Sequence, residues 1–434
     1  MFISMESQKI LSTTGRRIAV IDALRGFALL GVLLTHMISH FGYYLFEKAE
    51  RVPWLSGLDG FVGWLNANVL TGRFVNIFAF LFGLSFFIQM DRAATKGVDF
   101  RRKFLWRMAI LYAIGVVNTI FFSGDILTFY ACLGVIMVAL YKWRNWALIL
   151  LSFLLLCGGP RFCGALLLSP NQSAQTAEVA PSDSGTINAE ETPPTNPAEW
   201  SSDDNPARDF VKQMGSQTFA VSVKMNLVFG LLGKIMFQFF ATNRGFITLA
   251  LFVLGLLVGR LRFFETLHLH PRRNMILFVA FAVGLVVVNW LISRFPQTNL
   301  ANLFVGGVQS YKSIALMSLQ DIATVLLSAT LVMGFVVLYQ LPMMEKVLAV
   351  LAPYGRMGLT NYVMQSIIGA MIFAPWALGS IFGSWSLTEI FLLGLIIYAL
   401  QIAESALWLK YFKYGPLEWF WRTATYMKMQ PFKK

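Results

Sequence analysis

Apolar stretches of about 20 residues alternate with short polar segments along most of this chain. A helix needs about 20 mostly apolar residues to cross the hydrocarbon core of a bilayer. Ten windows fit that pattern: 17–40, 72–90, 104–122, 126–141, 146–168, 244–262, 274–294, 316–340, 356–375 and 389–411. The pattern therefore predicts an all-α fold, a polytopic transmembrane helical bundle of about ten spans.

One long polar segment interrupts the pattern. Residues 169–216 are rich in Ser, Thr, Pro, Asn and acidic residues, and no Lys or Arg occurs between Leu166 and Ala207. Such a composition cannot bury enough apolar surface to become ordered. We expect a flexible extracytoplasmic loop that separates an N-terminal half of five helices (1–168) from a C-terminal half (217–434).

The positions of the basic residues predict the orientation of the bundle. Lys and Arg gather in alternate short loops, for example between Arg92 and Lys103, and again after Lys410. Cytoplasmic loops carry such an excess, so both termini should be cytoplasmic. The first window holds Asp22 and Arg25 and lacks a small-residue cleavage site, so it should stay as an anchor. A multi-pass protein of the bacterial cytoplasmic (inner) membrane is expected.

Residues 217–242 do not fit this scheme. The segment is apolar but contains Lys224 and Lys234. It could form an eleventh span, a re-entrant helix or an amphipathic helix on the outer leaflet. An eleventh span would reverse the orientation of everything that follows it.

Composition narrows the class of protein further. Hydrophobic residues make up 57% of the 434 positions and charged residues only 13%, about half of what a soluble domain carries. The net charge of +13 follows the loops, and no nucleic-acid-binding motif accompanies it, so no nucleic-acid partner is expected. No His-Glu-x-x-His or Cys-x-x-Cys motif occurs, and no glycine-rich phosphate loop occurs. We therefore expect neither a metal nor a bound cofactor.

Three ionisable residues mark the first window. Asp22, Arg25 and His36 lie at spacings that place them on one face of a helix, with Arg25 and His36 about 16 Å apart along its axis. Ionisable groups inside a membrane usually indicate a functional interior. Asp22 and Arg25 could instead simply satisfy each other as an i,i+3 pair. His36 suits a general base or transient acyl carrier, with His40 as the competing histidine.

Other polar residues fall inside the predicted spans or at their ends. Asp125 lies in a Gly-Asp turn, and the further candidates for substrate binding are Arg73, Arg107, Arg356, Asn361, Gln365 and Glu404. Each of them, taken alone, is also explained by an interhelical hydrogen bond or a buried ion pair.

A segment after the last window combines a helix stop with aromatic and basic residues. In Gly415-Pro-Leu-Glu-Trp-Phe-Trp-Arg422 the Gly-Pro pair ends one helix, and Trp419, Trp421 and Arg422 suit a short helix at the inner membrane interface. Glu418 and Arg422 are spaced to form an i,i+4 pair.

Five motifs together resemble a known family. They are Ile21-Asp-Ala-Leu-Arg-Gly-Phe-Ala-Leu-Leu-Gly31, Phe78-Ala-Phe-Leu-Phe-Gly83, Gly124-Asp-Ile-Leu127 with Tyr130, Gly355-Arg-Met-Gly-Leu-Thr-Asn-Tyr362 with Gln365-Ser366, and Gly415-Pro-Leu-Glu-Trp-Phe-Trp-Arg422. The set resembles the YeiB-like bacterial inner-membrane proteins (domain of unknown function 418), which look like a branch of the transmembrane acyltransferase superfamily. That superfamily includes the lysosomal heparan glucosaminide acetyltransferase and bacterial O-acyltransferases of surface polysaccharides. Its signature, a basic residue, ten residues and a histidine, is matched here by Arg25 and His36, whereas many YeiB-like proteins carry asparagine at the histidine position.

The resemblance implies a membrane acyltransferase. An acyl-CoA-type donor would be the co-substrate and would approach from the cytoplasm, with Arg25, Arg107 and Arg356 near its phosphates. His36 would activate a hydroxyl or amine of an envelope glycan or lipid acceptor. Asp22 would orient Arg25, and Asp125 would hold the acceptor. Two alternatives stay open: a transporter or exporter of a small solute, and a non-catalytic membrane scaffold. The acceptor, the acyl length and the oligomeric state are not predicted.

Overall fold

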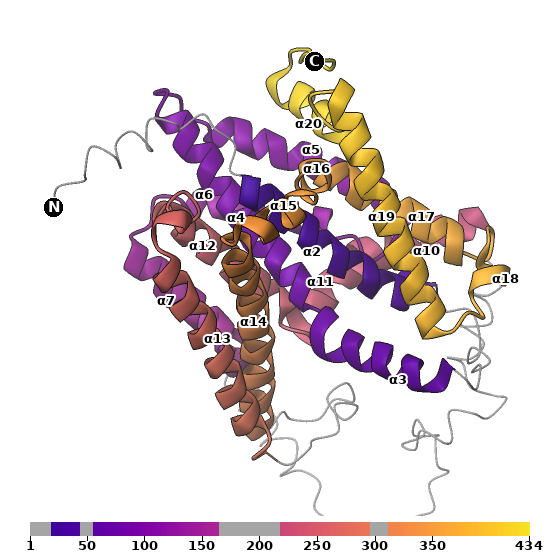
Figure 1. The fold of residues 1–434 in the computed structure, drawn as a ribbon, viewed down its shortest axis with the longest axis horizontal. Helices are drawn as coiled ribbons and strands as arrows, with labels where there is room; N and C mark the ends of the chain where they lie inside the picture. Colours follow the sequence, from indigo (N-terminus) through magenta and orange to yellow (C-terminus); the bar gives the residue numbers. More distant parts are fainter. Residues whose placement is uncertain (1–18, 44–54, 165–217, 296–310) are drawn as a thin grey trace, which may run out of the picture.

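The computed structural model describes residues 19–43, 55–164, 218–295 and 311–434, and within these ranges the fold is built from helices (Figure 1). The described residues contain no strand, only an isolated antiparallel bridge between Phe412 and Lys433. The predicted loop at 169–216 lies outside the described residues. The α-helices are α2 (Ala19–Ile38), α3 (Ser56–Leu65), α4 (Arg73–Ala94), α5 (Arg101–Thr119), α6 (Leu127–Leu140), α7 (Asn145–Leu156), α10 (Phe219–Val228), α11 (Lys234–Met236), α12 (Arg244–Arg260), α13 (Pro271–Ile292), α14 (Tyr311–Tyr339), α15 (Pro342–Ala349), α16 (Ala352–Arg356), α17 (Gly358–Phe373), α18 (Gly379–Phe382), α19 (Leu387–Tyr411) and α20 (Pro416–Tyr426).

Each of the ten predicted windows contains a helix. Among the described residues, five helical segments are long and apolar enough to cross a membrane: Ala19–Ile38, Ser56–Ala94, Pro271–Ile292, Lys312–Tyr339 and Leu387–Tyr411. No residue in the most apolar stretch of α13 is fully buried, and one face of this apolar helix is exposed to the surroundings of the bundle. Such a surface is stable against lipid and costly in water, which indicates a membrane protein.

Helix α2 lies at the centre of the bundle and carries Asp22, Arg25 and His36. Its apolar side chains, such as Leu24, Leu29 and Leu33, are completely buried, and α4, α16, α17 and α19 pack around it. The short helix α16 crosses α2 so closely that the two backbones touch. A Cβ on Gly355 would come within 1.8 Å of the main-chain oxygen of Asp22. Only glycine permits this contact, so the position of Arg356 next to α2 is fixed by the residue before it.

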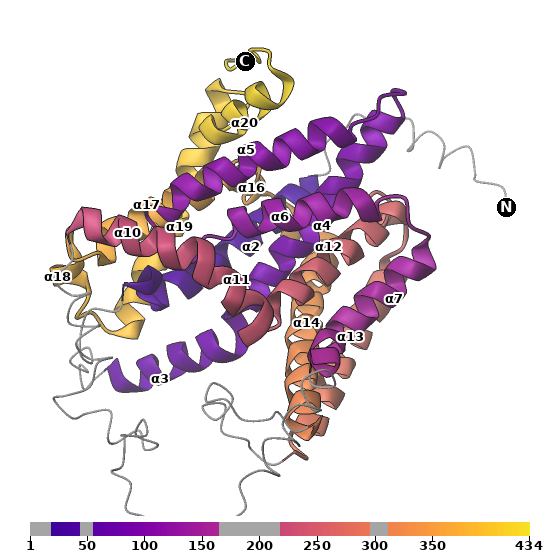
Figure 2. The ribbon, with the colours of Figure 1, turned by 180° about the vertical axis from the view of Figure 1, so that it is seen from behind.

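The bundle has two distinct ends, which we call the basic end and the far end. The basic end is where α4 finishes and α5 begins, with Arg92, Lys96 and Arg101 among its residues, and α20 lies there (Figures 1 and 2). The far end is where α2 finishes, near His36, and where α5 turns into α6. Helices α4 and α12 run side by side from the far end to the basic end.

The segment that the sequence left open, 217–242, lies across the far ends of its neighbours. At its start Phe219 packs on Trp376, just after α17, and in its middle Asn226 donates to the main-chain oxygen of Ile120 at the end of α5 (3.0 Å). It finishes next to the start of α12. Two π-helical stretches, Phe229–Gly233 and Phe237–Ala241, bend it. Both described ends of this segment therefore lie near the far end of the bundle.

Candidate functional site

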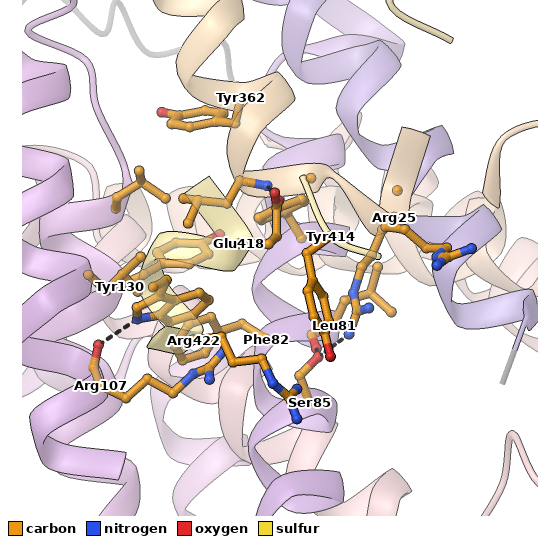
Figure 3. A pocket seen from close by; sticks show the side chains of 18 of the residues that line it. Arg25, Leu81, Phe82, Ser85, Arg107, Tyr130, Tyr362, Tyr414, Glu418 and Arg422 are labelled. Atoms are coloured by element: carbon orange, nitrogen blue, oxygen red, sulfur yellow. Dashed lines mark hydrogen bonds between the residues drawn. The ribbon is translucent and has the colours of Figure 1, made fainter. Parts of the chain in front are cut away.

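Two adjoining cavities lie between α2, α4, α5, α17 and α20. The inner cavity, of about 280 Å³, has Arg25, Ser85 and Arg107 in its walls and ends at Tyr362 (Figure 3). The second, which we call the vestibule, has about 600 Å³ and extends past Lys96 towards the basic end. The two share Arg25, Ser85, Gln89, Arg107 and Arg422, so they form one continuous depression.

Positive charge dominates this depression. Two carboxylates, Asp22 and Glu418, are present among its lining residues. Eight basic residues line it: Arg25, Arg92, Lys96, Lys103, Arg107, Arg356, Lys413 and Arg422. A cleft with walls of low dielectric and one sign of charge attracts ligands of the opposite sign. The depression is therefore suited to an anion that carries several charges.

Arg25 is held in place from two sides. Its Nη1 donates to Oδ1 of Asp22 one helical turn earlier (2.8 Å), and its Nη2 donates to Oγ of Ser85 on α4 (2.5 Å). The predicted i,i+3 pair therefore forms, yet the side chain of Arg25 stays 26% exposed. The guanidinium is thus fixed in orientation and still presents a surface to both cavities.

Arg107 and Arg422 are positioned by aromatic rings. The guanidinium of Arg107 lies 3.7 Å from the ring centre of Trp421, and the indole N–H of Trp421 donates to the main-chain oxygen of Arg107 (2.9 Å). Arg422 lies over the rings of Tyr414 and Tyr426, at 5.2 and 5.6 Å. Among the described residues neither arginine forms an ion pair. Cation–π contacts hold a guanidinium while leaving its N–H groups free for a ligand.

Glu418 is engaged elsewhere. Its Oε1 accepts from the main-chain N–H groups of Leu359 (2.7 Å) and Thr360 (3.1 Å), and its Oε2 accepts from Oγ1 of Thr360 (2.6 Å). The carboxylate therefore anchors α20 to the first turn of α17, where a negative charge is favourable. Burial raises the pKa of this carboxyl above its ordinary value, against the effect of these hydrogen bonds. Glu418 therefore does not form the i,i+4 ion pair with Arg422 that the sequence spacing allowed.

His36 lies outside both cavities. Its ring packs against Phe41 and Phe122, with centres 5.5 and 4.6 Å apart, and its Nε2 is buried without a hydrogen-bond partner. The turn between α5 and α6 lies between His36 and the inner cavity. Phe122 of this turn touches His36, while the N–H of Ile126 donates to the hydroxyl of Tyr362 at the end of the cavity (3.1 Å). His40 packs on Phe373 instead.

Asp125 belongs to the same turn and is completely buried. It accepts hydrogen bonds from the side chain of Asn118 (2.9 Å) and from the N–H and Oγ1 of Thr128 (3.0 and 3.2 Å). The Nζ of Lys234 lies 4.0 Å from its Oδ2. Asp125 thus stabilises the start of α6 through hydrogen bonds. It also pairs with Lys234, a contact that the sequence did not predict.

The remaining predicted residues lie apart from the depression. Asn361 donates to the main-chain oxygen of Tyr354 and to Oγ of Ser405, so it joins α17 to α16 and α19, while Gln365 donates to the Tyr354 hydroxyl and joins α17 to α16. Glu404 is exposed on α19. Arg73 begins α4 at the far end. The structure thus brings Asp22, Arg25, Arg107 and Arg356 together, and it does not bring the others to them.

Sequence reasoning missed several residues of the depression. Ser85, the partner of Arg25, is the small polar residue that follows the Phe78–Gly83 motif, and that position in an apolar helix was the available signal. Trp421 and Arg422 were assigned to a membrane anchor, whereas they form a wall of the cavity. Their spacing did not show that α20 folds back onto α5.

Comparison with known proteins finds one family model and several uncharacterised relatives. Residues 258–428 match the family model "Protein of unknown function (DUF418)". The chain is similar along nearly its whole length to an uncharacterized 39.9 kDa protein in the amylase 3' region of Bacillus acidopullulyticus (27% identity; 96% of this chain, 95% of that one). It is also similar to the uncharacterized protein YxaH of Bacillus subtilis strain 168 (28%; 97% of each chain).

A third similarity is more local. The uncharacterized protein YeiB of Escherichia coli K12 is 38% identical over 86 residues, which cover 20% of this chain and 21% of YeiB. No solved structure matches the chain. The region matched by the family model includes α16, α17 and α20, which supply Arg356, Tyr362 and Trp421 to the depression. The match to the DUF418 model over residues 258–428 and the local similarity to YeiB support a relationship to the YeiB-like DUF418 proteins of unknown function.

Proposed function

We propose that this protein is a multi-pass acyltransferase of the bacterial inner membrane, which binds an acyl-CoA-type donor in the depression and acylates an envelope glycan or lipid. The observation that carries the proposal is the convergence of Arg25, Arg107 and Arg422 on a depression with few carboxylates. Coenzyme A carries several phosphate groups, and planar guanidinium groups bind phosphate oxygens with paired hydrogen bonds. By the positive-inside rule the basic end faces the cytoplasm, where acyl-CoA is made.

The inner cavity changes in character with depth. Charged groups lie near the vestibule, whereas Phe78, Leu81 and Phe82 line the deeper part with Tyr130 and Tyr362. A donor with a phosphate-rich head and an apolar acyl arm changes from charged to apolar along its length in the same order as the cavity. This match supports an orientation with the head at the basic end and the acyl group next to the α5–α6 turn.

Acyl transfer then requires the α5–α6 turn to move. In the reaction the acceptor oxygen or nitrogen forms a bond to the acyl carbonyl carbon and the thioester C–S bond breaks. The imidazole of His36 takes the acceptor proton and passes it to the departing thiolate. Because Phe122 covers the imidazole, displacement of Phe122 has to precede this step.

The binding half of the proposal is tested with one matched pair of variants on α5. Arg107 lines both cavities, whereas Arg102 on the same helix is exposed and lines neither. Coenzyme A is titrated into purified protein by calorimetry. A hydrogen bond to a charged group contributes about 1.5–3 kcal/mol, so Arg107→Gln should weaken binding about 10- to 100-fold and Arg102→Gln should not. Equal affinity in the two variants would contradict the assignment of the donor site.

The chemical half is tested with the two histidines of the far end. His36→Ala and His40→Ala are compared in cells by mass spectrometry of acylated envelope glycans and lipids. The proposal expects an acylated species that disappears in His36→Ala and persists in His40→Ala. If the two variants behave alike, His36 is not the base.

Transport of an anionic solute is the second candidate. It is favoured by one observation, that the cationic depression extends into the bundle without including His36. Uptake of a phosphorylated solute into proteoliposomes, abolished by Arg107→Gln and unaffected by His36→Ala, would support transport over acyl transfer.

A further inference from the structure

A second group of charges lies at the far end, apart from the depression. It consists of Arg73, Arg161, Arg244, Asn243 and Asp321, which we call the arginine cluster. These residues come from the starts of α4 and α12, from α14 and from the chain after α7. Three cations and one carboxylate thus meet at the end of the bundle opposite the proposed donor site.

The single carboxylate is already occupied. Oδ2 of Asp321 accepts from Nη1 of Arg161 (2.7 Å) and from Nδ2 of Asn243 (3.1 Å), and both members of the ion pair are mostly buried. Arg73 uses its Nη1 on the main-chain oxygens of Ala67 (2.7 Å) and Thr71 (2.6 Å). Among the described residues, Arg244 donates no hydrogen bond. The cluster therefore holds positive charge that Asp321 does not neutralise.

The side chain of Arg244 reaches the residue that precedes Arg73. Gly72, which precedes Arg73, has a φ of +82°, and a Cβ there would come within 2.7 Å of Nη2 of Arg244. The Arg244 guanidinium consequently lies against the backbone at the start of α4. Two neighbouring positive charges repel each other, and an anion that binds both relieves this repulsion.

Both helix starts break the usual rule for charge at a helix end. Helices α4 and α12 are parallel neighbours, and each begins with an arginine, has no acidic residue in its first turn and has no side-chain cap. The start of a helix carries partial positive charge, so acidic residues are favoured there and arginine is not. Two adjacent helix starts with added arginines make a strong anion-binding arrangement.

Buried polar atoms in the cluster also lack partners. Oδ1 of Asn243 and Nε of Arg73 are buried without a hydrogen bond, and Asn243 itself is only 1% exposed with a left-handed backbone (φ +56°). Buried polar groups are nearly always satisfied by some partner. One of these atoms is a donor and the other an acceptor, so a partner that offers both, such as a protonated phosphate, would satisfy them.

We propose that the arginine cluster binds a phosphate group at the far end of the bundle, with Arg244 and Arg73 as its main ligands. The phosphate could belong to an anionic lipid headgroup or to a soluble phosphate compound, and both present the same oxygens to the two arginines. This inference does not depend on the donor site, because the two sites lie at opposite ends and share no residue.

The test uses the purified full chain in detergent, with inorganic phosphate as the probe and chloride at equal ionic strength as the reference. Because the depression also attracts phosphate, the comparison is made in protein that carries Arg107→Gln. We expect phosphate to raise the melting temperature of Arg107→Gln but not of Arg107→Gln/Arg244→Gln. Arg294→Gln is the matched control, since Arg294 is exposed after α13 and lies over Trp290. An equal phosphate response with and without Arg244 would overturn the proposal.

If Arg244→Gln does not fold, the more conservative variant Arg244→Lys provides the test. Arg244→Lys keeps the charge and loses the paired geometry, so about tenfold more phosphate should be needed for half of the effect. No change in Arg244→Lys would also overturn the proposal.

The source of the phosphate is decided in a second arm. Phosphatidylglycerol and phosphatidylcholine are added in separate micelles, and retained lipid is counted by native mass spectrometry. Retention of phosphatidylglycerol that Arg244→Gln abolishes identifies a lipid headgroup, whereas a response to inorganic phosphate alone identifies a soluble compound. A response to neither rejects the site.

Discussion

Replacing Trp421 tests whether aromatic support of Arg107 matters for anion binding. The change Trp421→Leu removes the ring beneath the guanidinium and the indole hydrogen bond to the main-chain oxygen of Arg107. Trp106 provides a matched control on the same pair of helices. Its indole N–H donates to the main-chain oxygen of Ala424 (3.0 Å), so it also joins α5 to α20, but it lines neither cavity.

The magnitudes follow from the contacts that each change removes. Both variants lose one hydrogen bond, about 1 kcal/mol of stability. Trp421→Leu also loses a shielded cation–π contact, up to about 2 kcal/mol, so its total loss should be about 3 kcal/mol. Arg107 then becomes mobile in the free protein, and fixing it again when the anion binds costs about 1 kcal/mol, or about fivefold in Kd.

Two measurements separate these effects. Thermal unfolding in detergent reports stability, and titration with coenzyme A reports affinity. Trp421→Leu should lower both, whereas Trp106→Leu should lower stability alone. An unchanged Kd in Trp421→Leu, or an equal loss of affinity in the two variants, would refute the idea that the indole positions Arg107 for a ligand.

Three further changes test other parts of the structure. Burial raises the pKa of Glu418, so the native state holds the carboxyl proton more tightly than the unfolded chain, and stability should fall as pH rises above about 4.3. The melting temperature of Glu418→Gln, which cannot titrate, should fall less over the same pH range. Parallel curves for the two proteins would contradict this. Gly83→Ala should lower stability by about 3 kcal/mol or more, because the new Cβ would lie 2.0 Å from a main-chain oxygen of α12, while Gly57→Ala, with open space around it, should be neutral in the same unfolding assay. Lys234→Met should cost about 3–5 kcal/mol by leaving Asp125 buried and unpaired, and adding Asp125→Asn should restore much of the loss; a double variant no more stable than Lys234→Met would argue against the pair.

The sequence predicted the helices well because hydropathy acts locally. Each apolar window contains a helix, and the i,i+3 spacing of Asp22 and Arg25 produced the expected ion pair. These features depend on one segment at a time. They need no knowledge of which helices become neighbours.

The candidate site was harder to predict because it depends on contacts between distant segments. Helical geometry places Arg25 and His36 on one face of α2, yet Phe122 from the α5–α6 turn separates His36 from the cavity. The pairing of Asp125 with Lys234 depends on the 217–242 segment folding back over α6. Neither contact leaves a periodic signal, since each joins residues of unrelated helices.

The folding back of α20 has a consequence for how this protein matures. Trp421 and the main-chain oxygen of Arg107 that it contacts are 314 residues apart in the chain. During synthesis α5 enters the membrane long before α20 exists, so the cationic groove stays uncovered until the ribosome has completed the helix that closes it. The walls of the depression are therefore completed late in synthesis, and an interruption of translation before α20 would leave the helices made earlier without one of these walls.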